Sequence, residues 1–318
     1  MKITLIGGAG FIGTNLAIAL SKKKDYVIQV VDGNAGYFEH IKRYVSGNVS
    51  YAVAEYSYDA DFDTLVSGQN TVYHLASSNI PGNSNQCMPE ELGINIVNTA
   101  KLLDACVRQG VQKVIFISSG GAVYGKNIKC PVREESNTNP ITSYGIQKLA
   151  IEKMLYLYKY QRGLDYRVIR LSNPYGPFQR PDGRLGAVTT FVYNAVNHRK
   201  LFVYGDGTVI RDFIYIEDAI RGILNIAEHE EKDRIFNLGS GRGSSINDVI
   251  ESIKRTINSS LDVVYMKSRS SDVPVNYLDI GRYEKYYGSL NAMDLDAGVA
   301  RTADFFEIEK KRKISIKS

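Results

Sequence analysis

The chain begins with Lys2-Ile-Thr-Leu-Ile-Gly-Gly-Ala-Gly-Phe-Ile-Gly13, a short apolar run followed at once by closely spaced glycines. The turn satisfies Gly-x-x-Gly-x-x-Gly and, from Gly8, also Gly-x-Gly-x-x-Gly. Glycines allow a tight turn and let the backbone approach a pyrophosphate, whose charge then faces the amides of the following helix. We therefore expect a dinucleotide to bind at Gly7, Gly10, Phe11, Ile12 and Gly13.

An acidic residue ends the second expected strand, Val27-Ile-Gln-Val-Val31, at Asp32. In this position a carboxylate accepts hydrogen bonds from the ribose hydroxyls of adenosine and repels a 2′-phosphate. Gly33 and Asn34 follow, so that no Arg is placed to hold such a phosphate. The pattern favours NAD over NADP, although a solvated Asp at a strand end is the simpler alternative.

Apolar strands alternate with helical patterns through the first half of the chain. The expected strands are 2–6, 27–31, 49–54, 71–75, 113–118 and 166–171, and the expected helices are 11–23, 90–109 and one that carries Tyr144 and runs to about 160. This alternation predicts an α/β fold, a doubly wound parallel sheet of the Rossmann type. We expect residues 1–173 to form this domain, with later segments returning to it, and residues 174–318 to form mainly a smaller α/β lobe.

The composition limits the partners. The 318 residues carry a formal charge of +5, and the longest basic run, Lys310-Lys-Arg-Lys313, is short and close to the end of the sequence. We expect no nucleic-acid partner. No apolar run reaches the length of a spanning helix, so we expect no membrane partner. The first residues run directly into an expected strand, so we expect no signal peptide. The three cysteines and four histidines have no metal-binding spacing, which predicts no metal site and fits a reducing cytoplasm.

Tyr144 and Lys148 are four residues apart on an expected helix and therefore share one face. An ammonium beside a phenol favours the phenolate, so a Tyr in this setting can act as a base near neutral pH. Many surface helices contain the same spacing, so the spacing alone does not indicate a site. The motifs on either side of it make the prediction more specific. Ser118-Ser-Gly-Gly-Ala-Val-Tyr-Gly125 precedes it and Arg170-Leu-Ser-Asn-Pro-Tyr-Gly176 follows it.

The order of these motifs resembles the extended short-chain dehydrogenase/reductase family, and within it the NAD-dependent nucleotide-sugar epimerases related to UDP-glucose 4-epimerase. The resemblance covers nearly the whole chain. It implies that Tyr144 is the base, while Lys148 lowers the pKa of that phenol and binds the nicotinamide ribose. It also implies further cofactor contacts at Glu55, Tyr56, Leu75, Ala76, Ser77 and Asn95.

One position departs from the family pattern. A Ser or Thr is expected four residues before Tyr124, where this chain has Gly120. Ser119 is the adjacent hydroxyl and our candidate for the missing catalytic group. A water, the amides of Gly120 and Gly121, or a loss of the hydroxyl with altered activity are the alternatives.

The resemblance also implies a set of substrate contacts. A diphosphate is bound best by bidentate Arg groups, with an aromatic residue against the base and polar groups around the sugar. The matching positions are Asn173, Tyr204, Arg211, Arg269, Asp272 and Asn276. A bulky aromatic residue at the last of these positions would exclude N-acetylated sugars, and Asn276 is smaller.

The sequence thus predicts an NAD-dependent nucleotide-sugar 4-epimerase, which oxidises and re-reduces C4 of a UDP-hexose or UDP-N-acetylhexosamine. A keto-sugar-nucleotide reductase or dehydrogenase would use the same site for a single hydride transfer. A catalytically silent NAD-binding protein is a third possibility because of Gly120. The helices at 90–109 and 143–160 resemble the pair through which the family dimerises, so we expect a homodimer.

Overall fold

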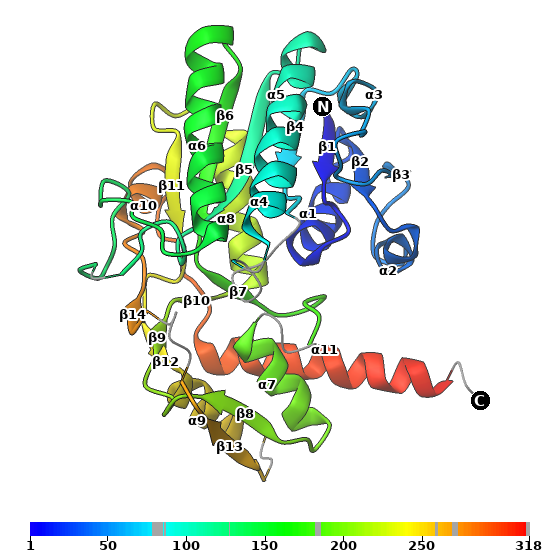
Figure 1. Ribbon diagram of the computed structural model, residues 1–318. Helices are drawn as coiled ribbons and strands as arrows, with labels where there is room; N and C mark the ends of the chain where they lie inside the picture. Colours follow the sequence, from blue (N-terminus) through cyan, green and yellow to red (C-terminus); the bar gives the residue numbers. More distant parts are fainter. Residues whose placement is uncertain are drawn as a thin grey trace. The chain divides into compact units, whose positions relative to one another are not determined.

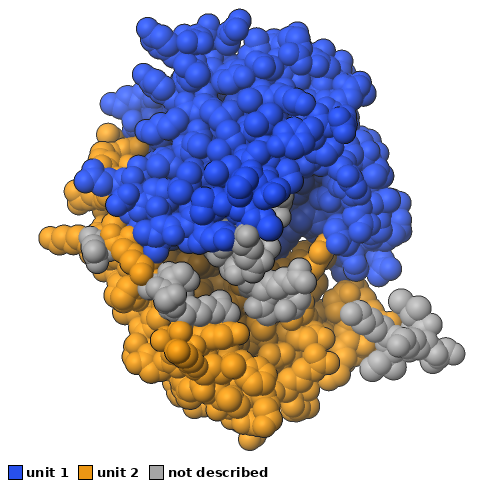
Figure 2. All heavy atoms as spheres, viewed as in Figure 1, with its two compact units in different colours: residues 1–125, 137–170, 220–236 blue, residues 126–136, 171–219, 237–318 orange. Residues whose placement is uncertain are grey.

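The computed structural model describes residues 1–77, 85, 87–126, 128–181, 186–257, 260–268 and 273–315, with the backbone alone for 313–315. The chain forms two compact units, which Figure 2 shows in different colours. Unit 1 comprises residues 1–125, 137–170 and 220–236, and unit 2 comprises residues 126–136, 171–219 and 237–318.

A seven-stranded sheet forms the centre of unit 1, with the order β11-β6-β5-β4-β1-β2-β3 (Figure 1). Its strands are β1 (Lys2–Ile6), β2 (Val27–Asp32), β3 (Val49–Val53), β4 (Thr71–His74), β5 (Lys113–Ser119), β6 (Asp165–Leu171) and β11 (Ile235–Leu238). The pairs from β3 through β2, β1 and β4 to β5 are parallel. Chain order reverses between β1 and β4, which is where ligands bind in doubly wound sheets. The predicted Rossmann-type fold is confirmed.

Helices cover the sheet because its central strands are apolar on both faces. They are α1 (Phe11–Ser21), η1 (Ala35–Tyr37), α2 (Phe38–Lys42), α3 (Phe62–Val66), α4 (Met88–Leu92), α5 (Asn98–Arg108), α6 (Ser143–Arg162) and α8 (Ile216–Glu228). Every residue of β4 is buried. The α6 helix has clear end signals: the Thr142 side chain accepts the amide of Gly145, and Gly163 closes the helix in a left-handed conformation.

The expected continuous helix over 90–109 is interrupted. A π-helical segment, η2 (Gly93–Val97), separates α4 from α5. Gly93 opens this segment, and a Cβ added there would lie 2.3 Å from the Tyr58 hydroxyl oxygen. An isolated π turn inside an α-helix is uncommon and is often found at functional sites. The single helix predicted from periodicity is therefore corrected to two α-helices joined by a π turn.

Short strands and longer helices build unit 2. Its elements are β7 (Asn173–Tyr175), α7 (Ala187–Val196), β8 (Leu201–Tyr204), β9 (Ile210–Arg211), β10 (Phe213–Tyr215), β12 (Ser244–Ser245), α9 (Ile246–Ile257), β13 (Val263–Met266), β14 (Val275–Asn276), α10 (Gly281–Tyr287) and α11 (Leu295–Ser315). The strands form three small sheets, β10-β7, β12-β9-β14 and β13-β8. Within the described part of the chain, no helix is both long and apolar enough to span a bilayer.

The division into units is more interleaved than a single boundary at residue 173. Residues 220–236, which follow that boundary, belong to the sheet unit. Residues 126–136, which precede the predicted boundary, belong to unit 2. There Val132 bridges to Leu278, and the Asn237 side chain donates to the Val132 carbonyl oxygen at 2.8 Å.

Candidate active site

The glycine turn after β1 is built for close backbone approach. Gly7 has φ +80°, and a Cβ there would lie 2.6 Å from the amide nitrogen of Ala76. A Cβ on Gly13 would lie 2.5 Å from the Gly8 carbonyl oxygen. The amides of Gly7 and Gly8 both donate to the Val31 carbonyl oxygen at 2.9 Å. The turn is thus tied to the end of β2, and two of its glycines cannot carry a side chain without displacing backbone.

A pocket of about 310 Å³ opens beside this turn in unit 1. It collects most of the predicted cofactor residues: Gly7, Gly10, Asp32, Glu55, Tyr56, Leu75, Ala76 and Ser77 line it. Phe11, Ile12 and Gly13 form the first turn of α1, which follows the glycine turn directly. These residues come from the ends of β1, β2, β3 and β4, as expected for a ligand site at the switch point of the sheet.

Asp32 lies in this pocket at the end of β2, and its carboxylate accepts the amide of Ala9 at 3.1 Å. The hydrogen bond fixes the carboxylate against the glycine turn while the side chain stays partly exposed. Gly33 also lines the pocket and carries no side chain. A carboxylate held beside a backbone cradle fits the adenosine ribose and diphosphate of NAD.

Tyr56 and His74 extend the pocket wall into the interior. The Tyr56 hydroxyl lies 2.8 Å from the Thr99 hydroxyl and 3.3 Å from Nε2 of His74. Burial lowers the pKa of His74 to about 3, with the positive charge of Lys148 as a smaller cause. The imidazole is therefore neutral near pH 7. It contacts Tyr56 of the pocket and is near enough to Lys148 for that charge to affect its pKa.

Asn95 lies on the π turn and is buried. Its amide nitrogen donates to Gln147 Oε1 at 2.7 Å and to the Glu91 carbonyl oxygen at 3.0 Å. Gln147 in turn donates to the Ser143 hydroxyl at 2.8 Å, and that hydroxyl donates to a Glu91 carboxylate oxygen at 2.9 Å. This buried chain fastens the π turn to the first turn of α6, where Tyr144 lies.

The two residues of the Tyr-Lys pair and Ser119 are brought together. The Ser119 side chain is hydrogen-bonded to Tyr144. The Lys148 ammonium donates to the Ile117 carbonyl oxygen at 2.9 Å and lies 5.5 Å from the centre of the Tyr144 ring. A hydroxyl hydrogen-bonded to a phenol, with an ammonium beside the phenol ring, is an arrangement that can pass a proton from a substrate alcohol.

The pKa values differ from the simplest expectation. Burial raises the pKa of Tyr144 to about 12, and the hydrogen bond to Ser119 acts in the opposite direction. Burial lowers the pKa of Lys148 to about 8, while Glu152 raises it. The protein's own groups therefore do not lower the pKa of the Tyr144 phenol below its usual value. Desolvation of the phenol outweighs the ammonium, which is held by the Ile117 carbonyl rather than by Tyr144.

A buried ion pair behind these residues did not enter the sequence predictions. Glu152 and Arg170 are both almost completely buried, and the Arg170 Nη2 to Glu152 Oε2 distance is 2.7 Å. Glu152 also accepts the Ser118 hydroxyl at 2.6 Å. The sequence held a signal for Glu152 alone, because this residue continues the four-residue spacing of Tyr144 and Lys148 on one helix face.

Two of the predicted substrate residues meet in unit 2. Arg211 on β9 is the register partner of Asn276 on β14, which is buried. Nη1 of Arg211 donates to the carbonyl oxygens of Ile210 and Val273 at 2.8 and 2.5 Å. Asn173 begins β7 and donates its amide to the Asp212 carbonyl oxygen at 3.0 Å.

The remaining predicted substrate residues lie elsewhere. Tyr204 ends β8 in the separate β13-β8 sheet and is 43% exposed, as an aromatic that covers a base would be. Arg269 and Asp272 fall outside the described residues. Among the residues that are described, no group of three or more His, Cys, Asp or Glu side chains could hold a metal ion.

The sheet, the pocket at its switch point and the Tyr144, Lys148 and Ser119 cluster match the pattern of the extended short-chain dehydrogenase/reductase family. Residues 3–239 match the model of the NAD-dependent epimerase/dehydratase family. The chain belongs to this family. The predicted family, the enzyme class of NAD-dependent nucleotide-sugar epimerases and the NAD cofactor are confirmed.

Individual relatives agree with this assignment. The putative UDP-glucose 4-epimerase of Methanocaldococcus jannaschii is 30% identical over 96% of this chain and 98% of its own length. The UDP-glucose 4-epimerase of Thermotoga maritima, solved with UDP-glucose, is 29% identical, with a TM-score of 0.89 over 98% of this chain and 100% of that one. The UDP-N-acetylglucosamine 4-epimerase of Methanobrevibacter ruminantium, in complex with UDP-N-acetylmuramic acid, is 28% identical, with a TM-score of 0.88 over 97% and 98%.

Proposed function

We propose that the protein interconverts the C4 epimers of a UDP-sugar, and that Tyr144, Lys148 and Ser119 carry out the proton transfers. The observation that carries this proposal is the hydrogen bond between Ser119 and Tyr144, with the Lys148 ammonium beside the phenol ring. It supplies a hydroxyl donor where the family pattern is interrupted by Gly120. A catalytically silent protein would have no need for this contact.

The roles of the side chains follow from their chemistry. The residues that line the pocket in unit 1 would hold NAD, which would supply the hydride acceptor and donor that the reaction at C4 needs. In its phenolate form, which the positive charge of bound NAD⁺ would favour, Tyr144 takes the proton of the C4 hydroxyl, and Ser119 shares that proton through its hydrogen bond to the phenol. Lys148 stabilises the phenolate by its charge. After the sugar turns, Tyr144 gives the proton back to the C4 oxygen of the epimeric sugar.

The substrate class is supported by the residues of unit 2 and by the relatives. We assign Arg211, Arg269 and Asn173 to the diphosphate, Asp272 to the ribose and Tyr204 to the base. Arg is the residue expected for bidentate contacts with a diphosphate. The named relatives act on or bind UDP-sugars. We therefore propose UDP as the nucleotide.

Asn276 bears on the choice of sugar. It is buried beside Arg211 in the β9-β14 register. Because Asn is smaller than an aromatic residue, we propose that UDP-N-acetylhexosamines are accepted together with UDP-hexoses. The neighbour from Methanobrevibacter is a UDP-N-acetylglucosamine 4-epimerase.

A panel of nucleotide sugars tests the function directly. UDP-glucose, UDP-glucuronic acid and UDP-N-acetylglucosamine are incubated with the purified protein and NAD, and the products are identified by NMR. The C4 epimer should accumulate to equilibrium without net formation of NADH. Stoichiometric NADH formation, or consumption when NADH and a keto-sugar nucleotide are supplied, would instead identify the dehydrogenase or reductase alternative.

We also propose that the protein is a cytoplasmic homodimer that supplies sugar donors for polysaccharide synthesis. The late turns of α6 leave large apolar side chains exposed, with Tyr156 61%, Leu157 46% and Tyr160 80% accessible. Cys87, Cys106 and Cys130 are free thiols, as in a reducing compartment. Sedimentation at micromolar concentration tests the dimer, and Tyr160→Lys should weaken it by placing like charges across a two-fold axis.

A further inference from the structure

Three consecutive residues of β5 each hold one residue of a single stripe on α6. Ser119 contacts Tyr144 through a hydrogen bond, and the Ile117 carbonyl accepts the ammonium of Lys148. The Ser118 hydroxyl donates to Glu152 at 2.6 Å. The stripe residues are four apart, so they share a face. The first two members are assigned roles in the reaction, and the third is an ionised group that the mechanism has not used.

The Glu152 carboxylate is fixed on both oxygens. Oε1 accepts from Ser118 and from Nε of Arg170 at 3.1 Å, and Oε2 accepts from Nη2 of Arg170 at 2.7 Å. The side chains of Arg170 and Glu152 are only 4% and 1% exposed. Nη1 of Arg170 donates to the Tyr124 hydroxyl at 3.0 Å, and the guanidinium lies 4.9 Å from the centre of that ring.

This ion pair therefore anchors both ends of the loop that carries Ser119. Glu152 holds Ser118 at the start of the loop and Arg170 holds Tyr124 at its end. Between them lie Gly120 and Gly121, which have no side chains to restrict the loop. Ser119, the last residue of β5, lies between these two anchors.

The surroundings of Lys148 give Glu152 a second effect. Phe116 and the Ile117 carbonyl face the ammonium from β5, and the phenol of Tyr144 faces it from α6. From β4, His74 is close enough to be affected by its charge, and it is neutral because burial lowers its pKa to about 3. Burial raises the pKa of Tyr144 to about 12, which keeps the phenol neutral as well.

From β6, Arg170 reaches this region only through its ion pair with Glu152. Among the described residues, Glu152 is thus the carboxylate that favours the charged form of Lys148. Even with Glu152 acting in the opposite direction, burial lowers the pKa of Lys148 to about 8, so the ammonium is already close to losing its proton near neutral pH.

We propose that Glu152 is a positioning residue of the reaction, which together with Arg170 anchors the segment from Ser118 to Tyr124 and places a negative charge on the face of α6 that carries Tyr144 and Lys148. The inference rests on the proposed roles of Ser119, Tyr144 and Lys148. A buried ion pair is weak evidence for stability, because an apolar pair of similar volume is often as stable. Its contacts with both ends of the catalytic loop give it a function that an apolar pair could not supply.

Two substitutions separate charge from geometry. Glu152→Gln keeps the shape and removes the charge, and Glu152→Asp keeps the charge and withdraws it by one methylene. Without the charge, the pKa of Lys148 falls further, so the alkaline limb of the pH profile of kcat should move down by about one unit. We expect kcat to fall roughly 10-fold with KM nearly unchanged, a part of the ~10²–10⁴-fold typical of acid-base help. Glu152→Asp should lower kcat and leave the limb in place.

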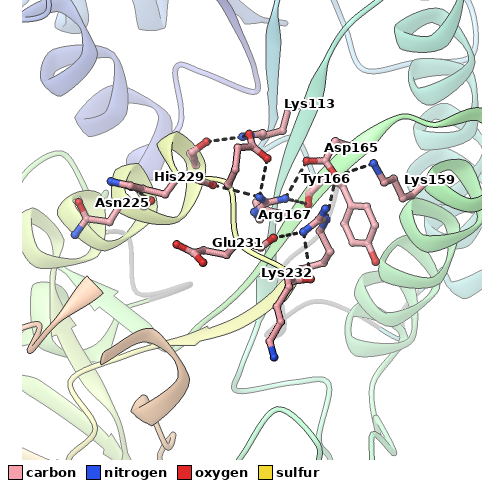
Figure 3. Close-up of polar contacts among 12 residues, drawn as sticks. Lys113, Lys159, Asp165, Tyr166, Arg167, Asn225, His229, Glu231 and Lys232 are labelled. Carbon is pink, nitrogen blue, oxygen red and sulfur yellow. Dashed lines mark hydrogen bonds and ion pairs between the residues drawn. The ribbon is translucent and has the colours of Figure 1, made fainter. Parts of the chain in front are cut away.

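A second buried pair on the same strand provides a matched control. Arg167 is fully buried and pairs with Asp165 at 3.0 Å, and Figure 3 shows Lys159 pointing to the same carboxylate. Arg167 also contacts Glu230, whose partner Lys113 begins β5, about 20 Å from Ser119 at ~3.3 Å per residue. Asp165→Asn should lower Tm without changing the pH profile or kcat at a temperature where the variant is folded.

Two further measurements keep the test decisive. If Glu152→Gln does not fold, Glu152→Gln/Arg170→Gln removes the pair without leaving an unmatched charge and should lower the pKa of Lys148 by a smaller amount, because a positive charge is lost as well. NMR of selectively labelled ¹³Cε-lysine, with Lys148→Arg for assignment, reports the ionisation of Lys148 without substrate. A Lys148 titration that is unchanged in both the single and the double variant would overturn the proposal. Failure of the wild type to epimerise any UDP-sugar would overturn the proposed function and leave the titration interpretable.

Discussion

The side chain of Ser119 is hydrogen-bonded to Tyr144, one residue before the glycine that stands where a hydroxyl was expected. The loop after β5 begins with two hydrogen bonds to the Ser119 carbonyl oxygen, from the amides of Ala122 and Val123 at 3.3 and 3.2 Å. Ser119 is thus held at the last position of the strand. Its contact with the phenol makes Ser119 a candidate proton donor. Comparison of the motifs alone would look for that donor one residue later, at Gly120.

Replacing this serine tests its role. Ser119→Ala should lower kcat by about 10²-fold, because one general acid-base contact is lost. Gly120→Ser should not raise the rate of the wild type, since the donor position is already filled. Both variants are compared in steady-state kinetics with NMR detection of the C4 epimer. Near-wild-type turnover in Ser119→Ala would show that water or the loop amides, and not Ser119, share the substrate proton.

The phenol is the group that moves the proton. Tyr144→Phe keeps the ring and removes the hydroxyl, so turnover should fall by at least ~10²-fold while binding of NAD and UDP-sugar changes little. Calorimetry measures the two affinities and product NMR measures turnover. Wild-type turnover in this variant would exclude Tyr144 as the base.

Cofactor choice depends on Asp32. NAD should bind and NADP should bind at least ~10-fold more weakly, because a 2′-phosphate would meet a carboxylate with no Arg to offset it. Asp32→Asn should narrow the difference, mainly by weakening the binding of NAD. Titration of each variant with both nucleotides in a calorimeter checks this. Equal affinity of the wild type for the two cofactors would show that the preference is wrong.

The glycine turn should be sensitive to a single methyl group. Gly7→Ala forces a left-handed residue to carry a Cβ, which costs ~1–2 kcal/mol before the contact with the Ala76 backbone is counted. We expect a lower free energy of unfolding and loss of NAD binding. Gly47→Ala is the matched control, because no atom lies within 4 Å of its added Cβ. Denaturant unfolding should show little change for this second variant.

Acid sensitivity should follow from His74. Burial lowers its pKa from 6.5 to about 3, so below pH 6.5 the unfolded state binds a proton that the native imidazole does not. The stability that neutral His74 contributes is present above pH 6.5 and decreases as the pH falls toward 3, by up to ~1.4 kcal/mol per pH unit. His74→Gln should lose less stability than the wild type between pH 7 and pH 5. Equal losses, measured by denaturant unfolding at each pH, would contradict this assignment.

The sheet and the cofactor pocket could be predicted because their signals are local. The apolar run before Gly7, the glycine spacing and the acidic end of the second strand are each set by what the backbone and a diphosphate require. Tyr144 and Lys148 could be found for the same reason, as a fixed spacing on one helix. The structure places all of them on the elements that the sequence predicted.

Other features depend on contacts between distant segments. No feature of the sequence near Glu152 indicates that Arg170, 18 residues later, is its ion-pair partner. Residues 126–136 join unit 2 through contacts with residues around 237 and 278, which no local pattern shows. The position of Ser119 was left open because adjacent residues of an extended segment point in opposite directions, and the turn that follows decides which one meets Tyr144.

The π turn at Gly93–Val97 has a consequence for any exchange of segments between this chain and its relatives. One additional residue in a helix rotates everything beyond it by about 100° around the axis. The apolar positions of α4 and α5 therefore follow two different phases, and Asn95 faces Gln147 only because the phase changes at that point. If an uninterrupted helix replaced the π turn together with α4 or α5, the apolar face of one of these two helices would be rotated away from its present packing partner. Segment boundaries for chimeras should be placed before Met88 or after Arg108, so that both phases are inherited together.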